Sequence, residues 1–166
     1  MKKKDLNGRK WSLLYQGSRD GFRASDFHSH CDGKPNTLII VKSENGNIFG
    51  GFTNIQWKSS ATGSWQEDKS AFIFSLVNKE NKSLLFEHMS SGINSIGSYT
   101  IHGPIFGAGN DIFISDSSNL NTSSYSNLGH IYTHPDYEYG SAKAITILAG
   151  SYYFQVQEIE VFQIQQ

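Results

Sequence analysis

The chain has 166 residues, of which 37% are hydrophobic, 13% aromatic and 17% charged, which predicts one domain with a substantial core and excludes a disordered chain. A formal net charge of −1 and a sequence pI near 6.6 leave no basic footprint for nucleic acid or for an acidic membrane surface. One cysteine excludes an internal disulfide framework, and no apolar run approaches the roughly 20 residues of a membrane-spanning helix, so we expect a cytoplasmic protein without membrane insertion.

The N-terminal segment is polar, and Lys2–Lys4 form its one basic cluster. We therefore expect residues 1–10 to be a linker or a tag-like leader and residues 11–166 to form the domain. The first apolar run, Leu13–Tyr15, leads into Gly17–Gly21. Glycine at both ends of a Ser-Arg-Asp triplet predicts a tight polar turn there.

A short helix is predicted over Arg23–Cys31. Ala24, Phe27 and Cys31 fall at positions i, i+3 and i+7, which is one face of a helix, and Gly33 supplies a stop. The pattern therefore predicts that Cys31 is a buried thiol.

A central hairpin follows. Thr37–Lys42 is apolar on both faces, which predicts a strand inside a sheet, and Asn45–Gly46 favours a two-residue turn because both residues tolerate positive φ. The return strand is Asn47–Thr53. Its Gly50–Gly51 pair weakens strand propensity and predicts a bulge or a close approach by another backbone.

The rest of the chain alternates short strands with polar loops. Ala71–Val77 is the strongest strand, and Ala142–Leu148 fits either a buried strand or a short helix. Further strands are predicted at Ser83–His88, Ser98–His102 and Asp111–Ser115. Loops are predicted at Ser59–Gly63, Ser90–Gly97 and Ser115–Tyr125.

The last strand changes its apolar face. Phe154 and Val156 are apolar at even positions, whereas Ile159 and Val161 are apolar at odd positions. A one-residue bulge between the two pairs would keep one face in the core. The bulge would place Glu158 and Glu160 together on the outer face of a terminal strand, where they would also discourage edge pairing. These elements together predict a mainly β fold, a two-sheet antiparallel β-sandwich flanked by short helices.

Catalytic chemistry has few candidates. No nucleotide-binding loop and no nucleophile elbow occur, so we expect no cofactor. His28 and His30 would point about 200° apart on a helix and could not share a metal ion, so we expect exposed histidines beside a buried Cys31. Cys31 and the paired acids Glu158 and Glu160 leave open a weak hydrolase or a thiol-based redox enzyme.

A carbohydrate-binding sandwich is a further alternative, because aromatic side chains on a sheet surface can stack against sugar rings. The residues that could form such a platform are Trp11, Trp57, Trp65, Tyr125, Tyr132, Tyr137 and Tyr139.

Several segments occur in a characteristic order, although each one alone is common. They are Leu13–Phe22, Cys31–Gly33, Thr37–Leu38, Asn45–Phe52, Phe72–Leu76, Gly103–Gly107 with Asp111–Ile112, and Val156–Phe162. Together they resemble the TLDc domain of eukaryotic oxidation-resistance and membrane-traffic proteins, over nearly the whole chain.

The resemblance implies a sandwich of two antiparallel sheets and a non-catalytic protein-interaction module. Members of this family are linked to protection against oxidative damage, and several bind the vacuolar-type proton ATPase. The expected partner is therefore the V1 sector of that pump or a comparable assembly, with no agreed catalytic residues to carry over. The candidate contact residues are Ser18, Arg19 and Asp20 in the turn and Glu158 and Glu160 in the last strand.

Overall fold

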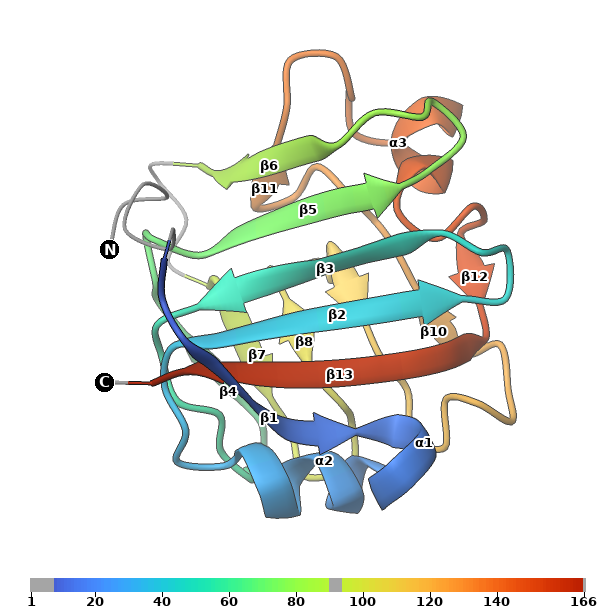
Figure 1. Cartoon of the computed structure of the whole chain (residues 1–166). Coiled ribbons are helices and arrows are strands. Elements are labelled where there is room, and N and C mark those ends of the chain that lie inside the picture. Colours follow the sequence, from blue (N-terminus) through green and yellow to red (C-terminus); the bar gives the residue numbers. More distant parts are fainter. Residues whose placement is uncertain (1–7, 90–93, 166) are drawn as a thin grey trace.

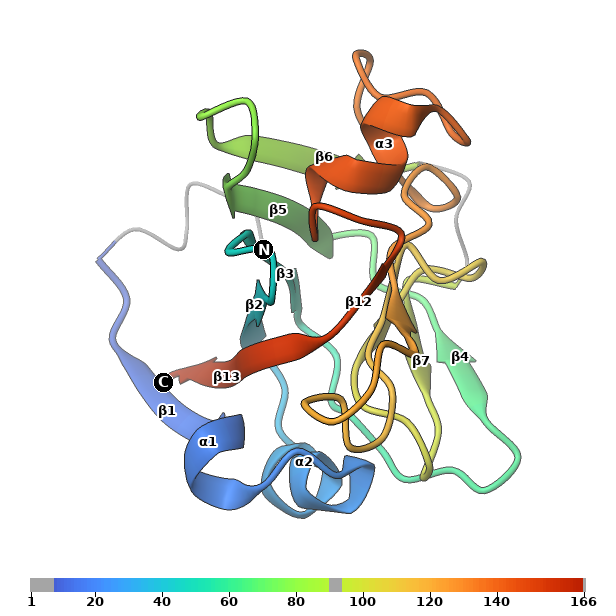
Figure 2. The same cartoon turned by 90° about the vertical axis from the view of Figure 1, so that its right-hand side faces the viewer.

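The computed structural model describes residues 8–89 and 94–165. These residues form thirteen strands and three short helices. The strands make two antiparallel sheets that face each other across the core (Figure 1, Figure 2). The prediction of a mainly β, two-sheet antiparallel sandwich flanked by short helices is confirmed.

The larger sheet has seven strands, and the two ends of the domain pair within it. Its order is β1 (Trp11–Gln16), β13 (Val156–Ile164), β2 (Thr37–Ser43), β3 (Ile48–Thr53), β5 (Phe72–Val77), β6 (Leu84–His88) and β11 (Tyr132–Thr133). The smaller sheet has six shorter strands. Its order is β12 (Tyr153–Phe154), β10 (Ser124–Tyr125), β9 (Ile112–Phe113), β8 (Ile105–Phe106), β7 (Ile96–Ser98) and β4 (Ser64–Gln66).

The core lies between the inner faces of the two sheets. Phe49 on β3 meets Phe154 on β12 edge to face, with ring centroids 5.4 Å apart. Trp57 meets Phe106 on β8 in the same way at 5.8 Å. All four side chains are buried, so aromatic contacts of this kind join the two layers.

The three helices lie at the margins of the sandwich (Figure 1). α1 (Gly17–Asp20) and α2 (Ala24–Cys31) lie beside β1, whereas α3 (Ala142–Ile147) lies at the opposite margin near β5 and β6. The face of α2 that carries Cys31 is buried, as predicted. Ser141 caps α3 by accepting a hydrogen bond from the Ala144 N–H at 3.1 Å, which settles the ambiguous segment as a helix.

The central hairpin is confirmed, with a longer turn than predicted. Ser43 N donates to Asn47 O and Gly46 N donates to Ser43 O, both at 3.0 Å, so three residues form the loop. Of the predicted turn pair only Gly46 has positive φ, at 80°. The close backbone approach expected at Gly50 is also present, because a Cβ there would lie 1.9 Å from the Ile39 carbonyl oxygen.

The bulge predicted in the last strand is confirmed. The pairing of β13 with β2 shifts register between Val156 and Glu158, and Ile159 lies in the core. The expected edge position of this strand is wrong, since β13 lies between β1 and β2. Glu158 and Glu160 therefore do not protect a sheet edge.

Several short strands differ from the prediction. The strand expected at Ser98–His102 is Ile96–Ser98 instead, because the chain turns after Ser98 and His102 N donates to Tyr99 O at 3.2 Å. Positions 90–93 of the loop predicted at Ser90–Gly97 lie outside the described residues, and its last two residues belong to β7. Strands of two or three residues, such as β4 and β11, are too short for alternation to reveal.

Candidate functional site

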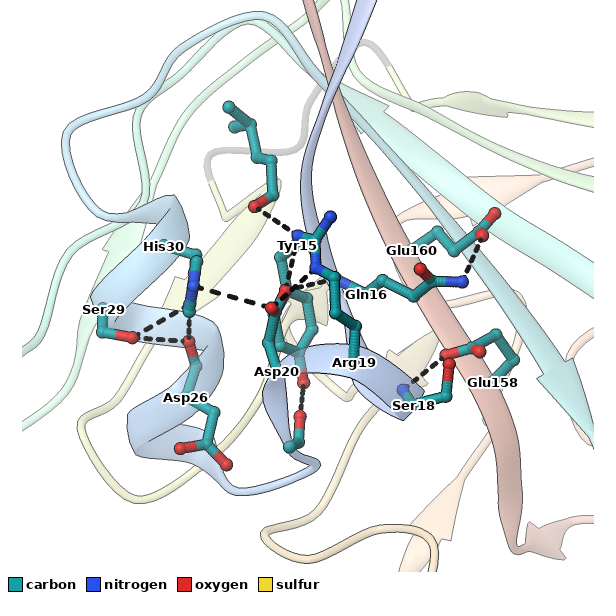
Figure 3. Close-up of polar contacts among 12 residues, drawn as sticks. Tyr15, Gln16, Ser18, Arg19, Asp20, Asp26, Ser29, His30, Glu158 and Glu160 are labelled. Carbon is teal, nitrogen blue, oxygen red and sulfur yellow. Dashed lines mark hydrogen bonds and ion pairs between the residues drawn. The ribbon is translucent and has the colours of Figure 1, made fainter.

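The predicted turn Gly17–Gly21 is a single helical turn, α1, followed by glycine (Figure 3). A Cβ on Gly17 would lie 2.6 Å from the ring of Phe22. Gly21 has φ of 105°, and a Cβ there would lie 2.3 Å from a carboxylate oxygen of Asp26. Both positions therefore need glycine, because the chain folds back on itself between β1 and α2.

Glu158 ties α1 to β13. Its Oε1 accepts hydrogen bonds from Ser18 N at 3.1 Å and from Ile159 N at 3.0 Å. Two residues farther along β13, Glu160 Oε1 accepts a hydrogen bond from Gln16 Nε2 at 3.2 Å. The structure thus brings two of the candidate residues, Ser18 and Glu158, together across a sequence separation of 140 residues, whereas Glu160 contacts Gln16.

Arg19 and Asp20 form a two-pronged ion pair that also holds the edge strand β1. Arg19 Nε and Nη2 each donate to Asp20 at 2.7 Å. Asp20 Oδ2 accepts from Gln16 N at 2.9 Å, and Arg19 Nη2 donates to Leu14 O at 3.4 Å. The hydrogen bonds from Arg19 lower the pKa of Asp20 to about 2. The side chain of Asp20 is only 12% exposed, and its hydrogen bonds hold the corner together. The side chain of Arg19 is half exposed.

Side chains behind α1 make this corner rigid (Figure 3). Tyr15 OH donates to Gly21 O at 2.7 Å, and burial raises the pKa of Tyr15 well above its usual range. His30 Nδ1 lies 2.8 Å from Asp26 O, and its Nε2 lies 4.0 Å from Asp20 Oδ1. These contacts fix the positions of the candidate residues before any partner binds.

An open hollow of about 520 Å³ lies beside α1. Its lining combines two apolar side chains, one base, one acid, three amides and one hydroxyl. The residues are Ser18, Phe22, Lys42, Asn119, Gln155, Val156, Gln157 and Glu158. The hollow is a shallow surface depression between α1, the start of β13 and the loop around Asn119.

Cys31 is fully buried in the main core, as the helical pattern predicted. Burial, with the nearby carboxylates of Asp32 and Asp20, raises the pKa of the thiol above its ordinary value. A thiolate is the form that attacks electrophiles and oxidants, so this environment opposes thiol chemistry at Cys31.

The two histidines of α2 point to different partners. His28 is buried, which corrects the expectation that it would be exposed; its Nδ1 lies 2.8 Å from Asp32 Oδ1 and its Nε2 lies 2.8 Å from Tyr99 O. The reason is that α2 is packed between β1 and the turn at Tyr99, so it buries more than one face. Within residues 8–89 and 94–165, no three His, Cys, Asp or Glu side chains are grouped closely enough to hold a metal ion.

One serine–histidine pair has the spacing of a nucleophile and its base. Ser95 Oγ lies 2.8 Å from His88 Nε2, and Asp68 N also donates to that oxygen at 2.6 Å. Ser95 is fully buried, so no substrate reaches it in this structure. The pair joins β6 to the segment before β7, and no sequence motif indicated it.

The fold does not bring the aromatic residues of the possible sugar platform together on one surface. Three of its aromatic residues are buried, namely Trp57, Tyr132 and Tyr137. On the smaller sheet, Tyr125 stacks on Phe113 at 4.9 Å and on Tyr152 at 5.5 Å. Rings stacked in this way cover each other's faces, which are the surfaces that a sugar needs.

Asp111 is a buried carboxylate that the sequence did not single out. It accepts backbone hydrogen bonds from Gly129 at 2.8 Å and from His130 and Ile131 at 3.0 Å. Burial raises its pKa to about 7, although these donors act in the opposite direction. Asp111 therefore organises the loop before β11. The sequence around it, a single Asp followed by two apolar residues, does not indicate such a role.

The described residues thus define a β-sandwich with a preorganised polar corner and no assembled metal site. In the same part of the chain, no helix has the length and apolar character needed to cross a membrane.

The chain belongs to the TLDc family, since the sequence model of the TLDc domain matches residues 1–165. It is also similar to the MTOR-associated protein MEAK7 of Mus musculus, with 26% identity over 94 residues. That match covers 57% of this chain and 19% of MEAK7, so the chain corresponds to about a fifth of that relative.

Proposed function

We propose that this domain is a non-catalytic protein-interaction module that contacts its partner through the corner formed by α1 and β13. The hydrogen bond from Ser18 N to Glu158 is the observation that carries the proposal, because it joins the two predicted contact elements into one surface. Glu158 and Glu160 make no ion pair with another described residue, and their carboxylates accept only from neutral groups. They remain available to a cationic partner.

The partner we propose is the V1 sector of the vacuolar-type proton ATPase or a comparable cytoplasmic assembly. The TLDc family match supports this choice, since several members of the family bind that pump. MEAK7 is named for its association with MTOR, which also supports a role in contact with a large protein assembly. Protection against oxidative stress would then follow indirectly, through the acidification of organelles.

Affinity capture from eukaryotic cytosolic extract tests this proposal. The bait is the folded domain, and the readout is mass spectrometry of the retained proteins. Glu158→Gln removes a charge but keeps an oxygen for Ser18 N, so it separates the charge from the structure of α1. Glu160→Lys reverses a charge without touching that hydrogen bond. Glu138→Lys is the matched control, because Glu138 is exposed in the segment that leads into α3, which lies at the opposite margin of the sandwich from α1 (Figure 1).

We expect the wild-type domain and the Glu138→Lys control to retain V1 subunits or another defined assembly. The Glu158→Gln/Glu160→Lys double variant should lose that assembly while its thermal unfolding stays close to that of the wild type. Equal capture by the double variant and the control would refute the assignment of this surface.

A further inference from the structure

The outer face of the larger sheet carries a second hydrophobic cluster, separate from the core between the sheets. Directly opposed residues on neighbouring antiparallel strands share one face, so the register defines rows across the sheet. One such row is Leu13, Phe162, Leu38, Phe52 and Phe72, on β1, β13, β2, β3 and β5. The outer face is therefore apolar across five strands.

The next two rows bring the acids onto the same face. Gln16, Glu160 and Ile40 lie opposite one another on β1, β13 and β2. Glu158 lies opposite Lys42 in the row after that. The carboxylates of β13 therefore border the apolar row directly, and two acids against one lysine leave this border negative.

At one end of this face the start of β1 crosses the neighbouring strands (Figure 1), and Trp11 packs edge to face on Phe52 with ring centroids 6.5 Å apart. No described helix lies over the rest of the face on β13 and β2 (Figure 1, Figure 2). Leu13 is 37% exposed, and Leu38, Ile40 and Phe162 are half-buried. Farther along the same row, the rings of Phe52 and Phe72 stack at 5.4 Å and are nearly fully buried. Leu38 therefore lies beside a packed aromatic pair, and the partly exposed side chains on β1, β13 and β2 form a contiguous apolar area of the kind that marks an interaction surface.

The shape of the surface favours a helix over an added strand. A strand adds at a sheet edge and needs free backbone groups there. At the edge strand β1, Asp20 already accepts from Gln16 N and Arg19 already donates to Leu14 O. A sheet face, in contrast, packs well against the apolar stripe of an amphipathic helix.

We propose that the outer face of β1, β13 and β2 binds a basic amphipathic helix of a partner protein. The apolar stripe of the helix would lie on Leu13, Phe162, Leu38 and Ile40, and its Lys or Arg side chains would reach Glu160 and Glu158. This inference rests on the proposed function, because it uses the same two acids, and it adds the sheet face and the chemistry of the partner.

A set of model peptides tests the inference. The probe is a fluorescein-labelled 18-residue Leu/Lys peptide with its leucines at helical spacing. A Leu/Glu helix of the same pattern tests the charge, and a Leu/Lys peptide with alternating leucines tests the helix. Affinity is measured by fluorescence anisotropy, and the surface is mapped by amide chemical-shift changes in NMR.

We expect saturable binding of the helical Leu/Lys peptide alone, with shifts confined to β1, β13 and β2. Glu160→Gln should weaken binding by about fivefold and Glu160→Lys by about tenfold, because an ion pair is lost and then replaced by repulsion. Leu13→Thr/Ile40→Thr keeps strand propensity while removing apolar contact, and it should weaken binding by about tenfold. Glu138→Lys should leave the affinity unchanged.

Absence of binding, shifts on the smaller sheet, or equal affinity of all variants would each overturn the inference. The capture experiment keeps this failure distinct from failure of the proposed function. If Leu13→Thr/Ile40→Thr captures the cellular assembly as well as the wild type while Glu158→Gln/Glu160→Lys does not, the corner is the contact surface and the sheet face is not.

Discussion

Replacing Asp20 with alanine removes the acceptor that holds the N–H of Gln16 in the edge strand β1. Asp20→Asn keeps one carbonyl oxygen for that N–H but loses the charge that pairs with Arg19. The two variants therefore separate the backbone cap from the ion pair, and Arg19→Ala completes the set.

The structure sets the size of the effect. A backbone N–H left without a partner costs about 1–3 kcal/mol, and half-buried Gln16 belongs near the lower end because water can partly replace the carboxylate. We expect Asp20→Ala to lower the free energy of unfolding by about 1.5 kcal/mol, or the melting temperature by about 3–6 °C. Asp20→Asn should cost less than half as much, and Arg19→Ala should cost little because water screens the half-exposed guanidinium.

The effect of Asp20 also depends on pH in a defined direction. The folded pKa of about 2 lies below the usual value near 3.9 for an unfolded chain. A carboxylate with a lowered pKa contributes its full stabilisation above the unfolded pKa and loses it as the pH falls through the folded pKa. The gap in melting temperature between wild type and Asp20→Asn should therefore be constant from pH 7 to pH 5 and shrink between pH 4 and pH 2.

Urea and thermal unfolding at pH 7 and pH 3 check these expectations, and analytical ultracentrifugation checks the edge. Asp20→Ala should self-associate more than the wild type, because it exposes a backbone donor of β1. The reasoning is refuted if Asp20→Asn costs as much as Asp20→Ala, or if the gap does not change between pH 7 and pH 3.

Three further experiments test the central hairpin and the interior. Gly50→Ala should lower the free energy of unfolding by about 3 kcal/mol, because its Cβ would meet the backbone oxygen of Ile39. Gly46→Ala meets no atom within 4 Å and should cost about 1 kcal/mol for its positive φ. Urea unfolding compares the two variants, and equal costs would contradict the reasoning. Cys31 should react with a thiol reagent roughly a thousandfold or more slowly in the native protein than in urea, because the reagent reaches the thiol only when the core opens. Fast labelling of the native protein would favour the redox alternative. Asp111→Ala should cost about 3 kcal/mol or more in urea unfolding, because it leaves three part-buried backbone N–H groups without their acceptor. A cost under about 1 kcal/mol would contradict the role given to this carboxylate.

Elements with a clear period could be predicted from the sequence. The face of α2 that carries Cys31, the hairpin around Gly46 and the bulge before Ile159 all follow from spacings within ten residues. Such patterns are local because side chains repeat every 3.6 residues on a helix and every two on a strand. The very short strands, and α1 with its four residues, lack the length for any period to appear.

The residues of the candidate site could be predicted from the sequence, but the contacts among them could not. The sequence marked Ser18–Asp20 and the acids at 158 and 160 as polar groups in exposed elements. It did not indicate that Glu158 accepts the N–H of Ser18, or that Asp20 is occupied by Arg19 and the backbone of β1. These contacts depend on the pairing of the first strand with the last, which no local pattern encodes.

The sequence by itself determined the two-sheet β architecture, the buried thiol and the outer placement of Glu158 and Glu160, because alternation and helical spacing sort side chains between core and surface. Only the tertiary structure decided what lies beside those acids. Strand order inserts β13 between β1 and β2, and its register sets Glu160 opposite Ile40, one row from the apolar row of Leu13, Phe162 and Leu38. Register between distant segments results from the packing of the whole core, so a surface made of three strands appears only when the chain is folded.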